Sequence, residues 1–257
     1  QQVEMPSEHR IVFTSRDVES GLELQHLFTA DPSSNVVVAS TVVKNMSDTD
    51  VNVSWCAAPC FPIPARFTNI VSFEGRWAKE FQRINVPRVS GTYLRENRKG
   101  RTSHDCFPAM LMTTKNASET QGEVVAFHLG WSGNSRMLME DMHDGRGMVQ
   151  AGELLFPGEI CLAKEQQYKS PSLYCCYGFG GINEIRYNYH RFVRDHLLSP
   201  SVTKKARPIH FNTWEALYFN HDIATLYTLV EEAAAIGAER FILDDGWFLG
   251  RRNDASG

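Results

Sequence analysis

Short runs of apolar and β-branched residues, separated by turn-forming residues, dominate the first 165 positions of the chain. Residues 36–43 form one such run, and the turn-rich stretch 44–50 ends it. Residues 51–55 alternate apolar with polar, and further runs lie at 124–129 and 136–139. This alternation predicts strands with one buried and one exposed face. Many short strands with few helical stripes indicate a mainly β fold, an antiparallel sandwich, over residues 1–182.

The pattern becomes helical near residue 183. Ile185, Tyr189 and Phe192 recur at helical spacing, and Pro200 follows the expected end of this helix. The stretch 199–207 is short, polar and basic, which is typical of a linker. Residues 183–206 are therefore predicted to form a linker helix with its connection.

A strand, a helix and a second strand are predicted within residues 207–257. Residues 208–212 are expected to form the first strand and residues 240–243 the second. Asp222 suits the N-cap of the intervening helix, and Gly237 suits its carboxyl end. The apolar positions of that helix are Ile223, Leu226, Tyr227, Val230, Ala233 and Ala234. Two strands joined by a helix in this way form a βαβ unit, so the strands should be parallel.

Polar residues follow both of these strands, at 212–215 and at 244–247. In parallel α/β folds, ligands bind at the carboxyl ends of the strands. Adjacent carboxylates such as Asp244 and Asp245 are costly to desolvate without partners, and sugar hydroxyls supply such partners. The indole of Trp214 or Trp247 could cover the apolar face of a pyranose. The residues alone leave a second interpretation open, in which the two aspartates form a turn or a helix cap and the tryptophans belong to the core.

Composition and charge narrow the class of protein. The chain has 42% hydrophobic and 22% charged residues, which is ordinary for a globular protein. Its 26 Lys and Arg against 30 Asp and Glu leave a net charge of −4, without the clustered positive charge that nucleic acids or anionic membranes attract. No apolar run is long enough for a membrane span. We therefore expect no nucleic-acid partner and no membrane partner.

Metal and redox chemistry find little support in the sequence. The nine His do not fall in metal-ligand spacing, so neither a metal site nor a cofactor is predicted. The six Cys are too few for a disulfide scaffold and are expected to be reduced and structural. Because no signal peptide is visible, a cytoplasmic location is expected.

The motifs NTWEA (212–216) and DDGWF (244–248) together resemble the start of the catalytic barrel in the α-galactosidases of glycoside hydrolase family 36. Four segments upstream of these motifs also resemble segments of this family, and they occur in the same order as in the family. These segments are GRWAKE (75–80), RKGRTSH (98–104), LGWSGN (129–134) and YHRFVR (189–194). The resemblance thus covers most of the chain.

The resemblance implies an amino-terminal β-supersandwich over residues 1–182 with its start missing, then the linker helix, then the first strand, helix and second strand of a (β/α)₈ barrel over residues 207–257. It implies that Asp244 and Asp245 bind the 4- and 6-hydroxyls of a terminal α-galactose and that Trp214 lies in the active site. Trp247 is a further substrate-binding candidate.

The same resemblance predicts that this chain is a fragment of a larger enzyme. A complete barrel takes about 250 residues. Family members hydrolyse with retention, using two aspartates on later strands, and no residue of this chain matches either one. We therefore expect part of a homo-oligomeric α-galactosidase that acts on raffinose- or melibiose-type sugars, and a chain that is inactive alone.

Two alternatives stay open at this stage. The whole protein could be an α-N-acetylgalactosaminidase or a galactosyl transferase on the same scaffold. The chain could instead be a non-catalytic β-sandwich module that binds carbohydrate or serves assembly.

Overall fold

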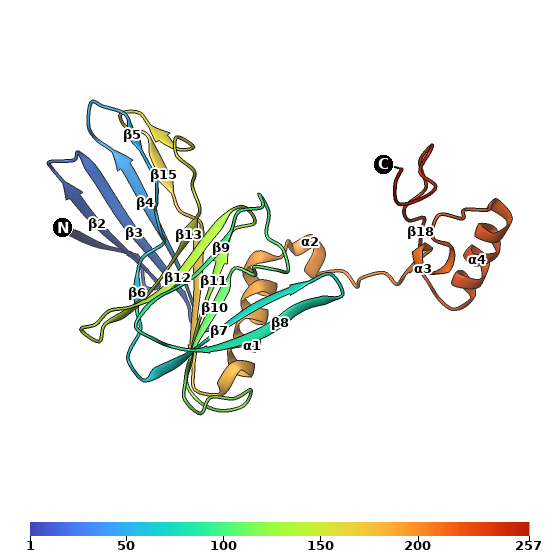
Figure 1. The fold of residues 1–257 in the computed structure, drawn as a ribbon, viewed down its shortest axis with the longest axis horizontal. Coiled ribbons are helices and arrows are strands. Elements are labelled where there is room, and N and C mark those ends of the chain that lie inside the picture. The colour runs from blue at the N-terminus through green and yellow to red at the C-terminus, as the bar shows by residue number, and fades with distance from the viewer. Residues whose placement is uncertain (257) are drawn as a thin grey trace. The chain divides into compact units, whose positions relative to one another are not determined.

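The structure, a computed structural model, describes residues 1–256 (Figure 1). It consists of two compact units, Gln1–Leu197 and Leu198–Gly257. No helix within the described residues is long and apolar enough to cross a membrane.

The first unit is built mainly from strands. They are β1 (Gln2–Ser7), β2 (Arg10–Asp17), β3 (Leu22–Asp31), β4 (Val36–Asn45), β5 (Val51–Asn52), β6 (Phe61–Pro62), β7 (Phe67–Arg76), β8 (Lys79–Pro87), β9 (Gly91–Asn97), β10 (Ala109–Thr114), β11 (Val124–Gly130), β12 (Ser135–Asp141), β13 (Gly147–Glu153), β14 (Cys161–Leu162), β15 (Gln167–Lys169) and β16 (Ser172–Gly178).

These strands form antiparallel sheets, which confirms the predicted mainly β, antiparallel fold. The largest sheet of the described residues has ten strands in the order β1-β2-β3-β4-β16-β11-β10-β7-β8, with β15 also paired to β4. A four-stranded sheet has the order β6-β13-β12-β9, and β5 pairs with β14. Strand β16 comes late in the sequence but lies at the centre of the large sheet, between β4 and β11.

The main core contains side chains from both of these sheets. Phe127 and Met110 of the large sheet share one buried cluster with Met139 and Val149 of the four-stranded sheet. Because successive side chains of a strand point to opposite faces, the neighbouring residues of the large sheet face the other way. The vicinal cysteines illustrate this alternation, since Cys175 belongs to this core and Cys176 to a second cluster.

Helix α1 (Gly181–Phe192) contributes to that second cluster. Its Ile185 and Phe192 are buried together with Cys176 of the large sheet. The hydroxyl of Tyr189 lies 2.8 Å from the carbonyl oxygen of Tyr174 and 3.0 Å from that of Ala126. The predicted helix therefore packs on the large sheet as part of the first unit.

Two details of the connections differ from the sequence prediction. Residues 51–55 form only the two-residue strand β5, although their exposure alternates as predicted. The helix continues past Phe192 as a π-helical turn, η1 (Val193–Leu197), and the predicted linker contains a short helix, α2 (Pro200–Thr203). The predicted domain limits at residues 182 and 206 stay predictions.

The second unit contains the predicted βαβ arrangement. Strands β17 (His210–Asn212) and β18 (Arg240–Ile242) pair in parallel, and helix α4 (Ile223–Ala235) lies between them in the sequence. Asp222 caps α4 by accepting a hydrogen bond from the backbone N–H of Thr225 at 2.9 Å, as predicted. Gly237 follows the helix with a φ of +91°, a value that glycine adopts readily.

Helix α4 buries only part of its apolar surface. Ala233 is 3% exposed, whereas Ile223 and Tyr227 are each 69% exposed. A short helix that the sequence did not predict, α3 (Trp214–Leu217), follows β17 directly. The larger barrel implied by the resemblance stays a prediction.

Candidate functional site

The parallel pairing of β17 and β18 brings the two predicted polar motifs to one edge of the second unit. His210, Phe211 and Asn212 pair with Arg240, Phe241 and Ile242 in register. The rings of Phe211 and Phe241 stack at a centroid distance of 5.3 Å, which fixes the two strands side by side. Residues that follow Asn212 and Ile242 therefore meet at the same edge.

Asp244 is held by residues from the end of β17. Its Oδ2 atom accepts a hydrogen bond from the Asn212 side-chain amide at 2.5 Å, and its backbone N–H donates to the Thr213 hydroxyl at 3.1 Å. Thr213 is completely buried, and its own N–H donates to the carbonyl of Ile242. The position of Asp244 is thus set by the neighbouring strand as well as by its own.

Asp245 forms an ion pair with Arg251. The guanidinium Nη2 lies 2.7 Å from Oδ2, and Nε lies 3.0 Å from Oδ1. These hydrogen bonds hold the pKa of Asp245 below its ordinary value, so the carboxylate stays ionised. The N–H of Gly246 donates to Oδ1 at 2.8 Å.

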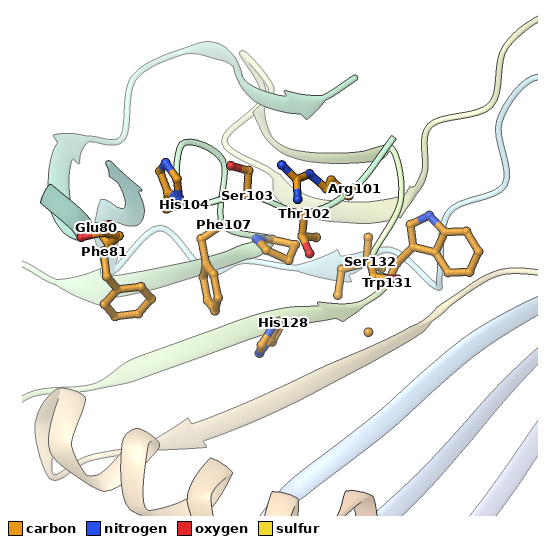
Figure 2. Close-up of a pocket in the computed structure, with 13 residues that line it drawn as sticks. Glu80, Phe81, Arg101, Thr102, Ser103, His104, Phe107, His128, Trp131 and Ser132 are labelled. Carbon is orange, nitrogen blue, oxygen red and sulfur yellow. The ribbon is translucent and has the colours of Figure 1, made fainter. Parts of the chain in front are cut away.

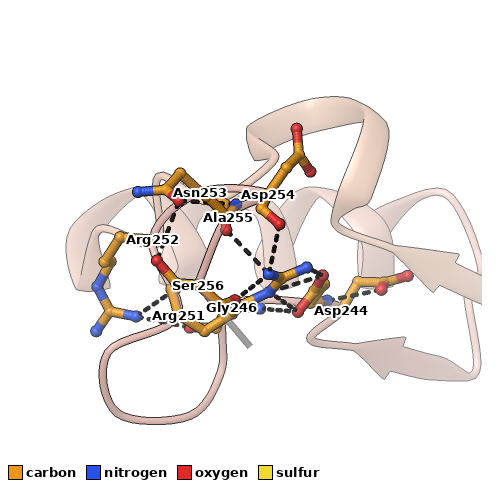
Figure 3. A network of polar contacts seen from close by, with 9 residues as sticks. Asp244, Gly246, Arg251, Arg252, Asn253, Asp254, Ala255 and Ser256 are labelled. Atoms are coloured by element: carbon orange, nitrogen blue, oxygen red, sulfur yellow. Dashed lines mark hydrogen bonds and ion pairs between the residues drawn. The ribbon is translucent and has the colours of Figure 1, made fainter.

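Arg251 is itself positioned by several groups. Its Nη1 donates to the backbone carbonyls of Asn253, Asp254 and Ser256 (Figure 3). The guanidinium therefore connects the Asp245 carboxylate to the backbone of residues 253–256. The same guanidinium lies over the ring of Phe219 at 5.2 Å from its centroid. An arginine held in this way fixes the orientation of the carboxylate that it contacts.

The two candidate tryptophans have different surroundings. Trp214 begins α3 and is half-buried, and its ring packs edge-on against Tyr218 and Phe219 at 5.3 and 5.0 Å. Trp247 is 69% exposed and contacts Phe248 at 5.3 Å. Within residues 1–256, neither indole N–H donates a hydrogen bond to Asp244 or Asp245. Trp247, two positions after Asp245, is therefore more exposed than Trp214.

The structure adds Phe219, His221 and Arg251 to the predicted site residues, and it gives Thr213 of the predicted stretch 212–215 a contact to Asp244. Both ring nitrogens of His221 are buried without a hydrogen-bond partner among the described residues. A Cβ on Gly246 would lie 3.2 Å from both His221 and Phe219, so these rings pack close to the turn after Asp245. The basic pair Arg251–Arg252, which follows the aspartates within seven positions, is the signal from which the Asp245 ion pair could have been anticipated.

No three metal-ligating His, Cys, Asp or Glu side chains come together among residues 1–256. The carboxylates of Asp244 and Asp245, the guanidinium of Arg251 and nearby aromatic rings lie at this edge. Such groups accept hydrogen bonds from hydroxyls and cover apolar faces of a ligand.

Comparison with known families matches almost the whole chain. The model of the glycosyl hydrolase family 36 N-terminal domain matches residues 2–163, and the melibiase model matches residues 167–257. An α-galactosidase of Escherichia coli is 42% identical over 248 residues, which cover 96% of this chain and 35% of that protein. The α-galactosidase AgaA of Geobacillus stearothermophilus is 30% identical over 93% of this chain and 32% of its own length.

Solved structures agree with these sequence matches. AgaA of Geobacillus stearothermophilus, solved in complex with stachyose, superposes with a TM-score of 0.89 at 28% identity, over 95% of this chain and 34% of that one. The galactosidase domain of AgaSK, an α-galactosidase–sucrose kinase, superposes with a TM-score of 0.87 at 26% identity, over 98% and 35% of the two chains. The present chain thus spans about a third of the length of the relatives that it matches.

Proposed function

This chain belongs to glycosyl hydrolase family 36, and on that premise we propose that it is part of an α-galactosidase, an enzyme that hydrolyses terminal α-D-galactosyl residues with retention. The sandwich, the helix α1 and the first βαβ unit would then precede the rest of a (β/α)₈ barrel. The chain would supply part of the substrate-binding site, and later strands of the barrel would supply the reacting carboxylates.

The observation that carries this proposal is the fixed pair Asp244–Asp245 at the carboxyl end of β18. Asp244 uses one lone pair on each oxygen, toward Asn212 and toward the N–H of Asp245. The Oδ1 of Asp245 accepts from the N–H of Gly246 and from Nε of Arg251, and its Oδ2 accepts from Nη2 of Arg251 at 2.7 Å and shares the Nε hydrogen at 3.2 Å. Since a carboxylate has about four acceptor positions, Asp244 keeps two for ligand hydroxyls, whereas a hydroxyl at Asp245 would replace the longer of the two Arg251 contacts to Oδ2.

We assign Asp244 and Asp245 to the 4- and 6-hydroxyls of the terminal galactose, which donate to these carboxylates. The axial 4-hydroxyl distinguishes galactose from glucose, so a carboxylate fixed at that position contributes specificity as well as affinity. Trp214 or Trp247 would cover the apolar face of the ring. Together these residues orient the sugar for attack at its anomeric carbon, and orientation lowers the barrier by removing freedom of motion in advance.

The chemical step would use two further carboxylates. In a retaining glycosidase one attacks the anomeric carbon while the other protonates the leaving oxygen, and the second then activates water to release the sugar. We assign no residue of this chain to either role.

Raffinose- or melibiose-type sugars are the proposed substrates, supported by relatives solved with stachyose and with raffinose. A homo-oligomer is proposed for the whole protein, and its mass in solution tests this.

The test uses a protein that contains this chain together with a complete barrel. We expect it to hydrolyse an aryl α-galactoside faster than the matching N-acetylgalactosaminide. Asp245→Asn should lower kcat/KM roughly 5- to 150-fold, because charge-assisted hydrogen bonds to the sugar are lost. Asp254→Asn is the matched control, since that exposed side chain makes no hydrogen bond within residues 1–256.

Two results would refute the proposal. The absence of aryl α-galactoside hydrolysis by the folded whole protein would reject the activity. An Asp245→Asn variant with the kcat/KM of the wild type would reject the role of the aspartate. A preference for the N-acetylgalactosaminide would move the assignment to the related hydrolase.

A further inference from the structure

Two motifs of the sandwich that the proposed function does not use line one pocket of the first unit. Residues 101–104 lie on the loop between β9 and β10, and residues 129–132 lie at the end of β11 and in the turn that follows it. The pocket has a volume of about 730 Å³, within the range of roughly 300–1,000 Å³ that is typical of small-ligand sites. Both loops belong to the first unit, whereas Asp244 and Asp245 belong to the second, so the pocket and the aspartate pair are two different sites.

The two loops are fixed to each other by hydrogen bonds. The N–H of Thr102 donates to the carbonyl of Ser132 at 2.6 Å, and the N–H of Gly100 donates to the side-chain oxygen of Asn134 at 2.8 Å. The side-chain amide of Asn97, only 3% exposed, donates to the carbonyls of Arg101 and Gly133 at 2.5 and 3.3 Å. A pocket whose walls are already fixed loses little conformational entropy when a ligand binds.

The walls combine an aromatic face with polar groups that have no partner. Trp131 is 38% exposed and lies at one end of the pocket beside Ser132, whereas Phe81 and Glu80 lie at the other end (Figure 2). Among residues 1–256, the hydroxyls of Thr102 and Ser132 make no hydrogen bond, and the guanidinium of Arg101 has no carboxylate within ion-pair distance.

The orientation of the Trp131 indole is set by the backbone of its own turn. A Cβ on Gly133 would lie 2.7 Å from the indole Nε1, so the absence of a side chain at Gly133 leaves room for the ring. The lining that Trp131 shares also carries the hydroxyls of Thr102 and Ser132 and the guanidinium of Arg101, which are hydrogen-bonding groups suited to a ligand that is itself rich in hydroxyls.

We propose that this pocket of the sandwich is a second carbohydrate-binding site, which takes a neutral oligosaccharide by stacking one pyranose on Trp131 and by hydrogen bonds from its hydroxyls to Thr102, Ser132 and Arg101. The site needs no catalytic group. It would hold a sugar chain on the sandwich and so raise the local concentration of substrate for a site elsewhere on the same protein.

The charge of the lining favours a neutral ligand over a phosphorylated one. Arg101 is the one permanent cation among the lining residues, and Glu80 contributes a carboxylate. His128 lies in the pocket floor, and burial lowers its pKa, which keeps the ring neutral. A phosphate ester would need more positive charge than one exposed guanidinium provides.

The experiment measures binding of stachyose, raffinose and maltotriose to the full 257-residue chain through the five tryptophan indole N–H resonances. The variants are Trp131→Ala, Arg101→Gln and Asp245→Asn, and Trp77→Ala is the matched control because that indole is 81% exposed and lies outside the pocket lining. We expect saccharide to shift the Trp131 indole resonance. Trp131→Ala lacks this resonance, so its binding is measured by calorimetric titration and should be at least about tenfold weaker than that of the wild type. Arg101→Gln should weaken binding several-fold at the Trp131 resonance itself.

The variants separate this site from the aspartate pair. Asp245→Asn and Trp77→Ala should leave the shift of the Trp131 resonance and its midpoint unchanged. Arg101→Gln changes an exposed side chain, so it reports on binding even if Trp131→Ala fails to fold. If none of the three sugars shifts the Trp131 resonance, if Arg101→Gln binds as the wild type does, or if only inorganic phosphate shifts the resonance, the proposal is wrong. This test is independent of the α-galactosidase assignment. Asp245→Asn tests hydrolysis at the aspartate pair, whereas Trp131→Ala and Arg101→Gln test binding at the pocket of the sandwich.

Discussion

Replacing Asn45 by alanine removes the most extensively bonded side-chain amide of the sandwich. Asn45 is the last residue of β4 and is completely buried. Its nitrogen donates to the carbonyls of Thr49 and Leu162 at 2.7 and 2.8 Å. Its oxygen accepts from the backbone N–H and the hydroxyl of Ser47 at 2.9 and 2.7 Å. One amide thus joins the end of β4, the following turn and β14.

The cost of this substitution follows from those four contacts. A hydrogen bond contributes about 0.5–1.5 kcal/mol net, so the four together contribute roughly 2–6 kcal/mol. The turn around Ser47 and Thr49 is exposed, and water can replace the partners there, whereas the contact to Leu162 is buried. We therefore expect Asn45→Ala to lower the free energy of unfolding by about 3 kcal/mol.

Asn45→Asp is the matched variant, because it keeps the accepting oxygen and replaces the donor. A second carboxylate oxygen would then face the carbonyls of Thr49 and Leu162, so this variant should be less stable than Asn45→Ala at pH 7. Burial beside carbonyl oxygens raises the pKa of the new carboxyl in the folded state above about 3.9, its unfolded value. The folded state then binds more protons between the two pKa values, and the variant gains stability relative to Asn45→Ala as the pH falls through that window.

The assay is urea unfolding followed by far-ultraviolet circular dichroism, which reports mainly on the strands of the first unit. Hydrogen exchange of peptides from β4 and β14 shows whether the loss of stability is local to the contacts of Asn45. An Asn45→Ala variant within about 0.5 kcal/mol of the wild type would refute the hydrogen-bond reasoning. An Asn45→Asp variant at least as stable as Asn45→Ala at pH 7 would refute the assignment of donor and acceptor.

Two further predictions concern titrating groups. In a protein with a complete barrel, Arg251→Gln should raise the pKa of Asp245, since the Arg251 hydrogen bonds are the main cause of its lowering, and galactose affinity should be lost at a higher pH on the acid side than in the wild type. An unshifted acid limb in the pH profile of galactose binding would contradict this. Burial raises the pKa of Cys176 to about 11, so iodoacetamide at pH 8 should label the exposed Cys161 well before Cys176. Peptide mass spectrometry measures the order, and early labelling of Cys176 would count against the packing of α1.

The features that the sequence predicted are those that local chemistry decides. Asp222 caps α4 because its side chain needs only the N–H three residues later, and Gly237 ends that helix because it accepts a positive φ. The alternation of buried and partly buried residues in β12 follows from the period of two in a strand, whereas β4 at the middle of the large sheet has no exposed residue. The placement of 212–215 and 244–247 at one edge required only that two strands be parallel.

The features that the sequence did not predict depend on contacts between distant or irregular segments. Arg251 was missed because its partner Asp245 lies across an irregular turn, where no helical or strand period fixes the spacing. The apolar positions of α4 were expected to form one buried face, yet Ile223 and Tyr227 are exposed among the described residues. Periodicity identifies an apolar face but does not say which element covers it. The pocket beside Trp131 likewise depends on two loops that meet only in the folded unit.

The position of β16 explains why the match to the family's amino-terminal domain ends earlier in the chain than the compact first unit does. The match to the family's amino-terminal domain ends at residue 163, before β16 begins at Ser172. However, β16 pairs with both β4 and β11, and Cys175 and Cys176 contribute to the two clusters on opposite faces of the large sheet. A chain that ended at residue 163 would separate β4 from β11 and expose apolar surface on both faces. Since α1 then covers one of those faces, the smallest independently packed form of the sandwich extends through that helix, as the compact unit Gln1–Leu197 does.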